Sequence, residues 1–352
     1  MTPRERVLRA VRHQEPDRVP LFYRDVPEVE ARLLRDLDLR SREELLDLLE
    51  IDFRWVGPDY VGPPLEEASG RRRDIWGVEY RWIEAGHGGQ YEPVAFPLEG
   101  VEDAGALDDY PWPQLEWFDF ETVDAQLQRH RGFAIMTAPG AASPGVLNTI
   151  QSLLGMERTL TDMLLSPAFF RSLAERIMDF NLRFIERLYD VAGDRIDFFR
   201  IGEDYGTQRG LLFGRPEWHE FIRPSLVAMS GIAKSHGSYY YQHTCGAVRE
   251  LIPDLIDVGV DVLDPLQVKA AGMAPAELKV EFGDKLCFSG GVDEQELLPR
   301  GTPDQVARAV RDLIDVLAPG GGFFLGPTHN FQADIPTENI VAMYRAAREY
   351  RR

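Results

Sequence analysis

The sequence contains little cysteine and no long apolar run. Its only two cysteines are Cys245 and Cys287, too few for a disulfide framework, which fits a reducing cytoplasm. No segment reaches the roughly 18 consecutive apolar residues that a membrane-spanning helix requires, and no apolar core of a secretory signal opens the chain. We therefore expect a cytoplasmic protein that has no membrane partner.

Basic charge is also scarce. The 352 residues carry a formal net charge of −19. Such an acidic excess disfavours non-specific binding to nucleic acids or anionic membranes, because both attract basic surfaces. The sequence has no GxGxxG motif after its first predicted strand, which disfavours a dinucleotide-binding domain. With 44% hydrophobic and 28% charged residues, the composition is that of a globular protein.

Short apolar runs alternate with helical patterns along most of the chain. The eight runs that we interpret as strands cover residues 19–22, 51–56, 133–137, 196–201, 238–242, 260–263, 286–288 and 322–325. Alternating strands and helices predict an α/β protein with a parallel sheet, and eight repeats predict a closed (β/α)8 TIM barrel. An open doubly wound sheet is the structural alternative.

The N-terminal part of the chain is less regular than the rest. We predict a single barrel domain over residues 1–352, with an N-terminal helical and irregular extension over residues 1–113 and regular βα repeats over residues 114–352. Within the extension, residues 74–82 alternate in the manner of a half-buried strand. Within the repeats, residues 150–189 form a long helical pattern.

The segment His243-Thr244-Cys245 directly follows one of the predicted strands. Active sites of TIM barrels lie at the C-terminal ends of the strands, so an imidazole and a thiolate at this place can bind one cation. Zinc accepts such nitrogen and sulfur ligands, and a catalytic zinc site needs three of them and an open position. We therefore predict that His243 and Cys245 are metal ligands; the alternative is that each is a buried core residue.

His329 is the predicted third ligand. Of the seven histidines, only His243 and His329 lie just past predicted strands. The strand before His329 is the last of the barrel, so its side chain is expected in the same mouth. The alternatives are that His329 only hydrogen-bonds a backbone carbonyl, or that Cys287 or an acidic residue replaces it as a ligand. Cys287 lies near the start of its strand, which favours a buried structural role.

Acidic residues follow other strand ends. Glu203 and Asp204 come after the fourth predicted strand, and Asp293 comes after the seventh. We predict that these carboxylates act as catalytic acids or bases, and Glu203 or Asp204 would also be able to complete a zinc site. The alternative is that they cap helices or pair with Arg209 or Arg215.

Substrate contacts are predicted at the last strand end and at a tyrosine. Asn330 and Gln332 follow the last predicted strand, and the ring of Tyr241 would border a flat ligand beside the mouth. The alternative for Tyr241 is packing within its strand, which the run Tyr239–Tyr241 favours. We expect two loops, residues 86–90 and 140–148, to contribute walls of the substrate site.

Several of these residues belong to motifs of a known family. The chain resembles the uroporphyrinogen decarboxylase superfamily over essentially its whole length, and most of all the branch that contains zinc-dependent cobalamin methyltransferases. The similar motifs are Thr2-Pro3-Arg4-Glu5-Arg6-Val7, His13, Glu15-Pro16-Asp17-Arg18-Val19-Pro20, His243-Thr244-Cys245-Gly246, Gly290-Gly291-Val292-Asp293 and Pro336-Thr337-Glu338-Asn339-Ile340.

The resemblance implies a methyltransferase with a (β/α)8 barrel and Zn2+ at the mouth. Zinc would bind a substrate thiol as its thiolate, which accepts a methyl group from methylcobalamin carried on a corrinoid-binding partner protein. Related enzymes transfer a methyl group from a methylated substrate to the corrinoid instead. The expected partners are therefore a corrinoid protein and a small thiol or methylated molecule, and the family implies a monomer or homodimer.

Two departures from the family pattern bear on the substrate. Relatives that methylate thiols usually have a cysteine close to the position of His329, and a His-Cys-His set would be more neutral and would make the zinc more electrophilic. The arginine-rich N-terminal motif of the true decarboxylases is not evident in this sequence. Its absence disfavours the decarboxylation of a porphyrinogen.

Two other functions remain open at this point. The first is a metal-free lyase that decarboxylates a polycarboxylate such as a porphyrinogen, with an Asp or Glu as acid or base and Arg71-Arg72-Arg73 as the binding site for carboxylates. The second is a barrel without enzymatic activity that binds a corrinoid or a corrinoid protein.

Overall fold

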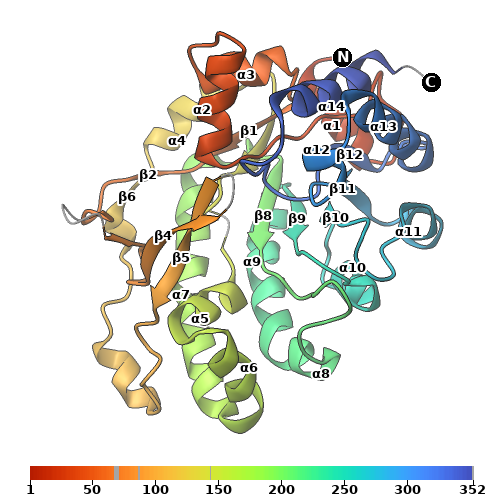
Figure 1. Cartoon of the computed structure of the whole chain (residues 1–352). Helices are drawn as coiled ribbons and strands as arrows, with labels where there is room; N and C mark the ends of the chain where they lie inside the picture. The colour runs from red at the N-terminus through yellow and green to blue at the C-terminus, as the bar shows by residue number, and fades with distance from the viewer. Residues whose placement is uncertain (67–70, 86–87, 143, 351–352) are drawn as a thin grey trace.

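Seven parallel strands form the centre of the computed structural model (Figure 1). The structure describes residues 1–66, 71–85, 88–142 and 144–350. The seven strands are β1 (Phe53–Val56), β7 (Ala134–Thr137), β8 (Phe198–Gly202), β9 (Tyr239–His243), β10 (Val262–Leu266), β11 (Cys287–Val292) and β12 (Phe323–Pro327). They are hydrogen-bonded in the order β1-β7-β8-β9-β10-β11-β12, and every neighbouring pair is parallel. Seven of the eight predicted strands are therefore confirmed.

The sheet curls until its two edges meet at the segment that holds the first predicted strand. Leu21 forms a parallel bridge with Leu325 of β12, and the Phe22 N–H donates to the Leu325 carbonyl at 2.9 Å. On the other side, the N–H of Asp52, next to β1, donates to the Leu21 carbonyl at 3.1 Å. The N–H of Leu21 donates to the Asp52 carboxylate and not to a neighbouring strand. The eighth place in the ring is therefore filled by isolated bridges and not by a regular strand.

Helices surround this ring, as Figure 1 shows. The α-helices are α1 (Pro3–Val11), α2 (Pro27–Asp36), α3 (Arg42–Leu48), α4 (Thr122–Arg129), α5 (Val146–Leu154), α6 (Met156–Leu165), α7 (Pro167–Ala192), α8 (Arg215–Glu217), α9 (Arg223–Ser235), α10 (Ile252–Asp257), α11 (Pro275–Phe282), α12 (Leu297–Arg300), α13 (Pro303–Leu317) and α14 (Thr337–Glu349). The π-helix η3 (Trp218–Ile222) and the short 3-10 helices η1 (Ala104–Asp109), η2 (Leu115–Trp117) and η4 (Arg249–Leu251) complete the helical elements of the described chain. Parallel strands inside a layer of helices confirm the predicted TIM-barrel-like fold, and the open doubly wound alternative is wrong.

Two features of the helices bear on the sequence predictions. The helical pattern over residues 150–189 is divided into α5, α6 and α7, because Gly155 has a φ of +83° and Pro167 begins a new helix. None of the helices in the described residues is both long enough and apolar enough to cross a membrane.

Apolar side chains fill the inside of the ring. The inner cluster consists of Val7, Ala10, Val11, Phe22, Phe53, Ala134, Met136, Phe198, Tyr241, Val262, Cys287 and Phe324. Residues of α1 belong to it because α1 lies across the N-terminal ends of the strands. The Arg4 N–H donates to the Gly132 carbonyl just before β7, and the Gly322 N–H, just before β12, donates to the Ala10 carbonyl. The base of the barrel is thus closed by α1.

An insertion between β1 and β7 holds two small antiparallel sheets. The first contains β3 (Arg72–Arg73), β4 (Glu79–Ala85) and β5 (Gly88–Ala95), and the second contains β2 (Asp59–Tyr60) and β6 (Phe118–Asp119). The strand predicted over residues 74–82 is only partly right. The Asp74 carboxylate accepts the N–H groups of Trp76 and Val78, which folds this stretch into a turn before β4 begins.

One buried carboxylate joins the base of the barrel to the segment that closes the ring. Asp52, fully buried before β1, accepts from Arg6 Nη1 of α1 at 2.6 Å and from Arg18 Nη1 at 2.7 Å. It also accepts the N–H of Leu21 at 2.7 Å. A buried carboxylate with three such donors fixes three separate segments at one point.

We expect Asp52→Asn to lower the free energy of unfolding by about 3–5 kcal/mol, because Arg6 and Arg18 would lose their buried counter-charge. Urea unfolding of the purified protein measures this loss. In the matched control, Asp179→Asn removes an exposed carboxylate that pairs with Arg183 within α7, and the loss should stay below about 1 kcal/mol. Equal losses in the two variants would contradict the role assigned to Asp52.

Candidate functional site

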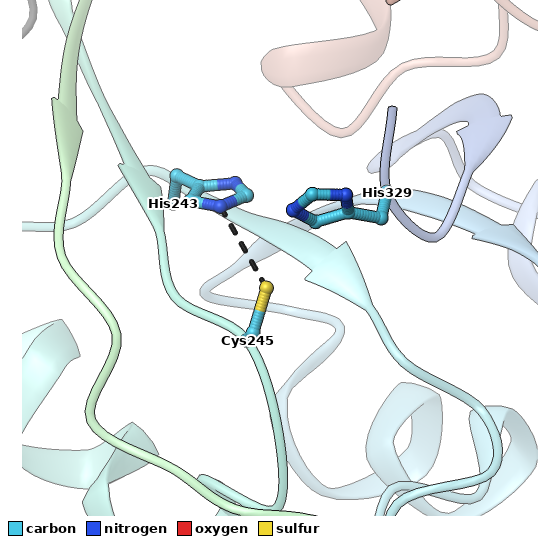
Figure 2. A group of neighbouring side chains, drawn as sticks. All are labelled: His243, Cys245 and His329. Carbon is cyan, nitrogen blue, oxygen red and sulfur yellow. Dashed lines mark hydrogen bonds between the residues drawn. The ribbon is translucent and has the colours of Figure 1, made fainter. Parts of the chain in front are cut away.

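Three potential metal ligands converge at the C-terminal mouth of the barrel. His243 is the last residue of β9, Cys245 lies two residues beyond it, and His329 lies two residues beyond the end of β12. Figure 2 shows their side chains pointing toward one another. The Cys245 Sγ and the His243 Nε2 are 3.7 Å apart, and one ligand atom from each residue lies within 4.8 Å of the others. The structure therefore brings together the three residues that the sequence predicts as ligands.

Strand alternation and a tight turn position the first two of these residues. Tyr241 belongs to the inner cluster, so His243, two residues further along β9, faces the same interior. The chain then turns at Gly246, which has a φ of +90° and where a Cβ would lie 2.5 Å from the backbone carbon of Gly206. A larger residue at this position would displace the loop that carries Cys245.

The segment that closes the ring also holds the loop of the third residue, His329. Asp25 forms a parallel bridge with Phe331. The Phe331 N–H donates to the Arg24 carbonyl at 3.0 Å, and the Val26 N–H donates to the Phe331 carbonyl at 3.2 Å. The position of His329 therefore depends on the N-terminal segment of the barrel as well as on β12.

A buried carboxylate orients His243. Asp264 Oδ2 lies 2.7 Å from His243 Nδ1, which assigns the proton to Nδ1 and leaves the Nε2 lone pair facing Cys245. Arg24 Nη1, which lies 3.1 Å from the same Nδ1, donates to Asp264 Oδ2 at 2.9 Å. Burial alone would raise the pKa of Asp264, but the charge of Arg24, the hydrogen bond with His243 and the charge of Arg200 together outweigh burial and hold this pKa well below its usual value. Asp264 is therefore an ionised acceptor for the imidazole N–H.

Both imidazoles are neutral in this environment. Burial lowers the pKa of His243, and burial together with the charge of Arg24 lowers the pKa of His329 to about 4. Neutral imidazole is the form that binds metals. Burial, and then the charge of Asp204, raises the pKa of Cys245. The thiol therefore keeps its proton until a cation takes the place of that proton.

Of the two acidic residues predicted after β8, Asp204 reaches the cluster and Glu203 does not. Asp204 Oδ1 accepts the Cys245 N–H at 2.8 Å and lies 3.8 Å from His243 Nε2. Glu203 is fully buried and accepts the N–H of Leu147, at the start of α5, at 2.6 Å. Burial raises the pKa of Glu203 to about 7. The structure thus places Glu203 as the helix cap that the sequence leaves as an alternative, and its catalytic role stays a prediction.

Asp293 also occupies a capping position. Its carboxylate accepts the N–H groups of Glu296 and Leu297, around the start of α12, at 3.2 and 3.0 Å. Arg215, one of its possible ion-pair partners, pairs instead with Asp254 at 2.7 Å. Among the described residues, Asp293 is not a member of the group of converging ligands. Its catalytic role therefore stays a prediction.

The predicted substrate residues lie at different depths. The ring of Tyr241 is inside the barrel below the mouth, and its hydroxyl donates to Ser289 Oγ at 2.7 Å. Asn330 and Gln332 are half-buried in the segment after His329, where Gln332 Nε2 donates to the Asn330 carbonyl at 3.2 Å. Their contacts with a substrate stay predictions.

Cys287 lies apart from the three converging residues. It is the first residue of β11 and is fully buried in the inner cluster. Within the described part of the chain, the group of convergent ligand atoms comprises His243, Cys245 and His329, and Cys287 is not a member. Its position matches the buried role that the sequence favours.

Two arginines beside the cluster are missing from the sequence-based prediction. Arg24 is buried against Asp264, and Arg200 faces the interior from β8 because it lies two residues after Phe198 of the inner cluster. Arg24 comes two residues after the first predicted strand. An examination of the residues after that strand, like that made for the later strands, would have identified it. Arg200 lies within a predicted strand, where spacing alone does not identify a functional residue.

A cavity of about 720 Å³ lies between the barrel mouth and the insertion. Gly202 lines this cavity and is the register partner of His243. Residues 140–142, 144, 145 and 148 also line it; residue 143 lies outside the described chain, and a contact of the loop over residues 140–148 with a substrate stays a prediction. The other predicted loop, residues 86–90, includes residues 86 and 87, which are also outside the described chain.

The sequence can be compared with known families at this point. The pattern of the family described as uroporphyrinogen decarboxylase (URO-D) matches residues 141–350, well over half of the chain. The chain belongs to the uroporphyrinogen decarboxylase family. The matched segment contains His243, Cys245 and His329, so the cluster lies in the part of the chain that matches this family. The superfamily predicted from the sequence is confirmed.

A solved structure of similar fold agrees with this membership. A methyltransferase from Methanosarcina mazei is similar with a TM-score of 0.67 over 99% of this chain and 99% of that chain, at 17% sequence identity. At this identity the similarity establishes a shared fold. None of the curated proteins matches the sequence.

We expect Asp264→Asn to weaken the binding of cobalt(II) by about 10–100-fold, because an amide does not fix the proton of His243 on Nδ1. Competition with a chromophoric chelator gives the affinity, and the sulfur-to-cobalt absorption band reports on Cys245. The matched control is Asp257→Asn, which removes an exposed carboxylate that pairs with Arg223 and should leave the affinity unchanged. Wild-type affinity in Asp264→Asn would show that Asp264 does not orient a metal ligand.

Proposed function

We propose that this chain is a zinc-dependent methyltransferase that moves a methyl group between a corrinoid on a partner protein and a small thiol or methylated substrate. The observation that carries the proposal is the convergence of two neutral imidazoles and one thiol at the barrel mouth. Membership of the uroporphyrinogen decarboxylase family and the methyltransferase of similar fold are in keeping with this class of reaction.

The three side chains fit a zinc ion. Tetrahedral zinc, with a Zn–S distance of about 2.3 Å and a Zn–N distance of about 2.0 Å, places sulfur and nitrogen ligands about 3.6 Å apart. The Cys245 Sγ and His243 Nε2 are already 3.7 Å apart. The three ligand atoms lie within 4.8 Å of one another, so small movements of the side chains would complete the set. Three protein ligands leave the fourth position for a substrate atom.

Bound zinc would supply a Lewis-acid centre at which a substrate thiol is ionised at neutral pH. The residues of this chain prepare that centre: Asp264 fixes the proton of His243 on Nδ1, and Arg24 keeps Asp264 ionised. Asp204 is half-exposed and lies beside Cys245. It is therefore placed to take the proton of the Cys245 thiol and to release it to solvent.

The transfer itself balances without a further reactant. In one direction, a sulfur–methyl bond forms while the cobalt–carbon bond of the methylcorrinoid breaks, and the corrinoid keeps the electron pair of that bond. In the other direction, the reduced corrinoid uses that pair to take the methyl group from a methylated substrate, whose heteroatom then gains a proton. In both directions a zinc ion held by His243, Cys245 and His329 would take the heteroatom of the substrate, so one site would serve both reactions.

The alternative of a lyase for polycarboxylates has less support. Arg71 and Arg73 lie 3.6 and 3.5 Å from the carboxylate of Glu79, and the Arg72 guanidinium covers the ring of Tyr91 at 4.8 Å. The arginines that this function requires for carboxylate binding therefore already have partners within the insertion. Tight binding of a porphyrin-like polyacid would favour the lyase.

Metal analysis of the purified protein and its cysteine variants tests the proposal. We expect about one zinc per chain in the wild type and in Cys287→Ala, and little zinc in Cys245→Ala, because only Cys245 supplies a thiolate at the mouth. Methyl transfer from methylcobalamin to a panel of thiols, or to the corrinoid from methoxy compounds, should be lost together with the zinc.

Cys287→Ala is the matched control, because it removes a buried thiol outside the cluster. A wild-type protein that contains no zinc, and whose activity does not change in Cys245→Ala, would overturn the proposed function. Zinc without methyl transfer to or from any compound of the panel would favour a barrel that only binds its ligand.

A further inference from the structure

We infer that the cavity between the barrel mouth and the insertion is a subsite for a flat aromatic group of the substrate, and that Trp55 connects this subsite with the mouth. The inference names a substrate class for the proposed function and rests on it for the chemistry. Binding of the aromatic group depends on the walls of the cavity and not on the metal.

The walls of the cavity contain aromatic rings that are not fully buried. The cavity volume of about 720 Å³ is that of pockets for small molecules, which commonly span about 300–1,000 Å³. Covering apolar surface that water still contacts is favourable. Six aromatic side chains in the walls keep part of their surface accessible, namely Trp55, Tyr60, Trp76, Tyr80, Tyr91 and Phe118.

These rings favour a flat aromatic ligand over a saturated one. The barrel contributes Trp55 from β1, and the insertion contributes Trp76 before β4, Tyr80 on β4 and Tyr91 on β5. Aromatic rings bind one another by stacked or edge-to-face contacts, which add to the gain from burial of apolar surface. A saturated ring system has no π electrons and a puckered shape, so it gains from burial alone.

Trp55 belongs to both the cavity and the barrel mouth. It lies two residues after Phe53 of the inner cluster on β1, so its side chain faces the interior of the barrel and packs against that cluster. Its ring meets the Phe22 ring edge to face, with the centroids 5.6 Å apart, and the Arg24 guanidinium lies 5.9 Å from the centroid of the same Phe22 ring. Arg24 Nη1 in turn lies 3.1 Å from His243 Nδ1. A series of contacts therefore joins Trp55 to one of the potential metal ligands.

Two further wall residues contact the segments that hold the potential ligands. Gly202 lines the cavity at the end of β8 and pairs in register with His243. Asn148 of α5 also lines the cavity, and its Oδ1 accepts the N–H of Asp204 at 3.2 Å. Asp204 in turn accepts the Cys245 N–H at 2.8 Å. The inferred substrate therefore has its aromatic group in the cavity and the heteroatom that exchanges the methyl group on the side of Gly202 and Asn148.

A pair of probes with the same carbon skeleton tests this inference. 2-Naphthalenemethanol is flat and aromatic, whereas decahydro-2-naphthalenemethanol carries the same alcohol group on saturated rings. Equilibrium dialysis against the full-length protein gives both affinities. We expect the wild type to bind the aromatic alcohol at least about 10-fold more tightly than the saturated one, because only the aromatic rings make stacked and edge-to-face contacts with the walls.

Variants of two wall residues locate the source of the preference. Trp55→Leu and Tyr91→Leu each replace a ring, one from the barrel and one from the insertion, by an apolar side chain that does not stack, and each should lower the preference by about 3-fold or more. Trp55→Phe keeps a ring and should retain most of the preference. Trp117→Leu is the matched control, because it removes a half-buried ring of the insertion that is outside the cavity, and it should keep the wild-type preference. Unfolding midpoints of the variants show whether each is folded.

The outcomes separate the subsite from the proposed function. Retention of the preference in Cys245→Ala, which lacks the thiolate ligand, would support the subsite whatever the metal analysis shows, and loss of the preference in this variant would contradict it. Equal binding of the two probes by the wild type, or no binding of either at its solubility limit, would overturn the subsite and leave the zinc proposal standing. An undiminished preference in folded Trp55→Leu and Tyr91→Leu would also overturn it.

Discussion

Closure of the barrel through the segment after Val19 is the constraint on which the site depends. Backbone hydrogen bonds join Leu21 and Phe22 to both edges of the sheet. The same segment continues to Arg24, which contacts Asp264, and to Asp25, which pairs with the loop of His329. The three potential ligands come from two distant parts of the chain, so they converge only in a closed ring. The buried Asp52 network stabilises that ring from the opposite end of the segment.

The mouth combines buried charges with neutral potential ligands. Arg24 offsets the charge of Asp264, while burial and the charge of Arg200 lower the pKa of His243 and keep it a neutral donor of an electron pair. Burial opposes ionisation of Cys245, whose pKa is raised. A thiolate in such a place is stable only beside a cation. Burial therefore has two effects on Cys245. It keeps the thiol protonated when no cation is bound, and it strengthens the attraction between the thiolate and a bound cation.

The sequence predicts strand ends well, and it predicts less well what side chains do there. His243, Cys245 and His329 each follow a distinct apolar run, so their meeting at one mouth follows from barrel topology. Glu203 also follows such a run, yet it turns to the start of α5, because a buried carboxylate is stabilised by the free N–H groups of a helix. Spacing along the chain does not distinguish these two outcomes.

The insertion is the part that the sequence predicts least. Asp74 accepts local N–H groups and forms a turn inside a stretch with the alternation of a strand, which is how such side chains compete with regular structure. The rings that line the cavity come from elements far apart in the chain, among them β1 and α7, and their approach depends on tertiary packing.

The position of α1 determines where molecules can enter and leave the barrel. Val7, Ala10 and Val11 stop the narrow end of the ring, so the described barrel is a blind chamber and not a channel. Water expelled by an incoming molecule leaves through the opening by which that molecule arrives. In the proposed methyl transfer, a small substrate and the corrinoid would therefore have to enter by the same opening, and the cavity between the mouth and the insertion has room for the smaller of the two.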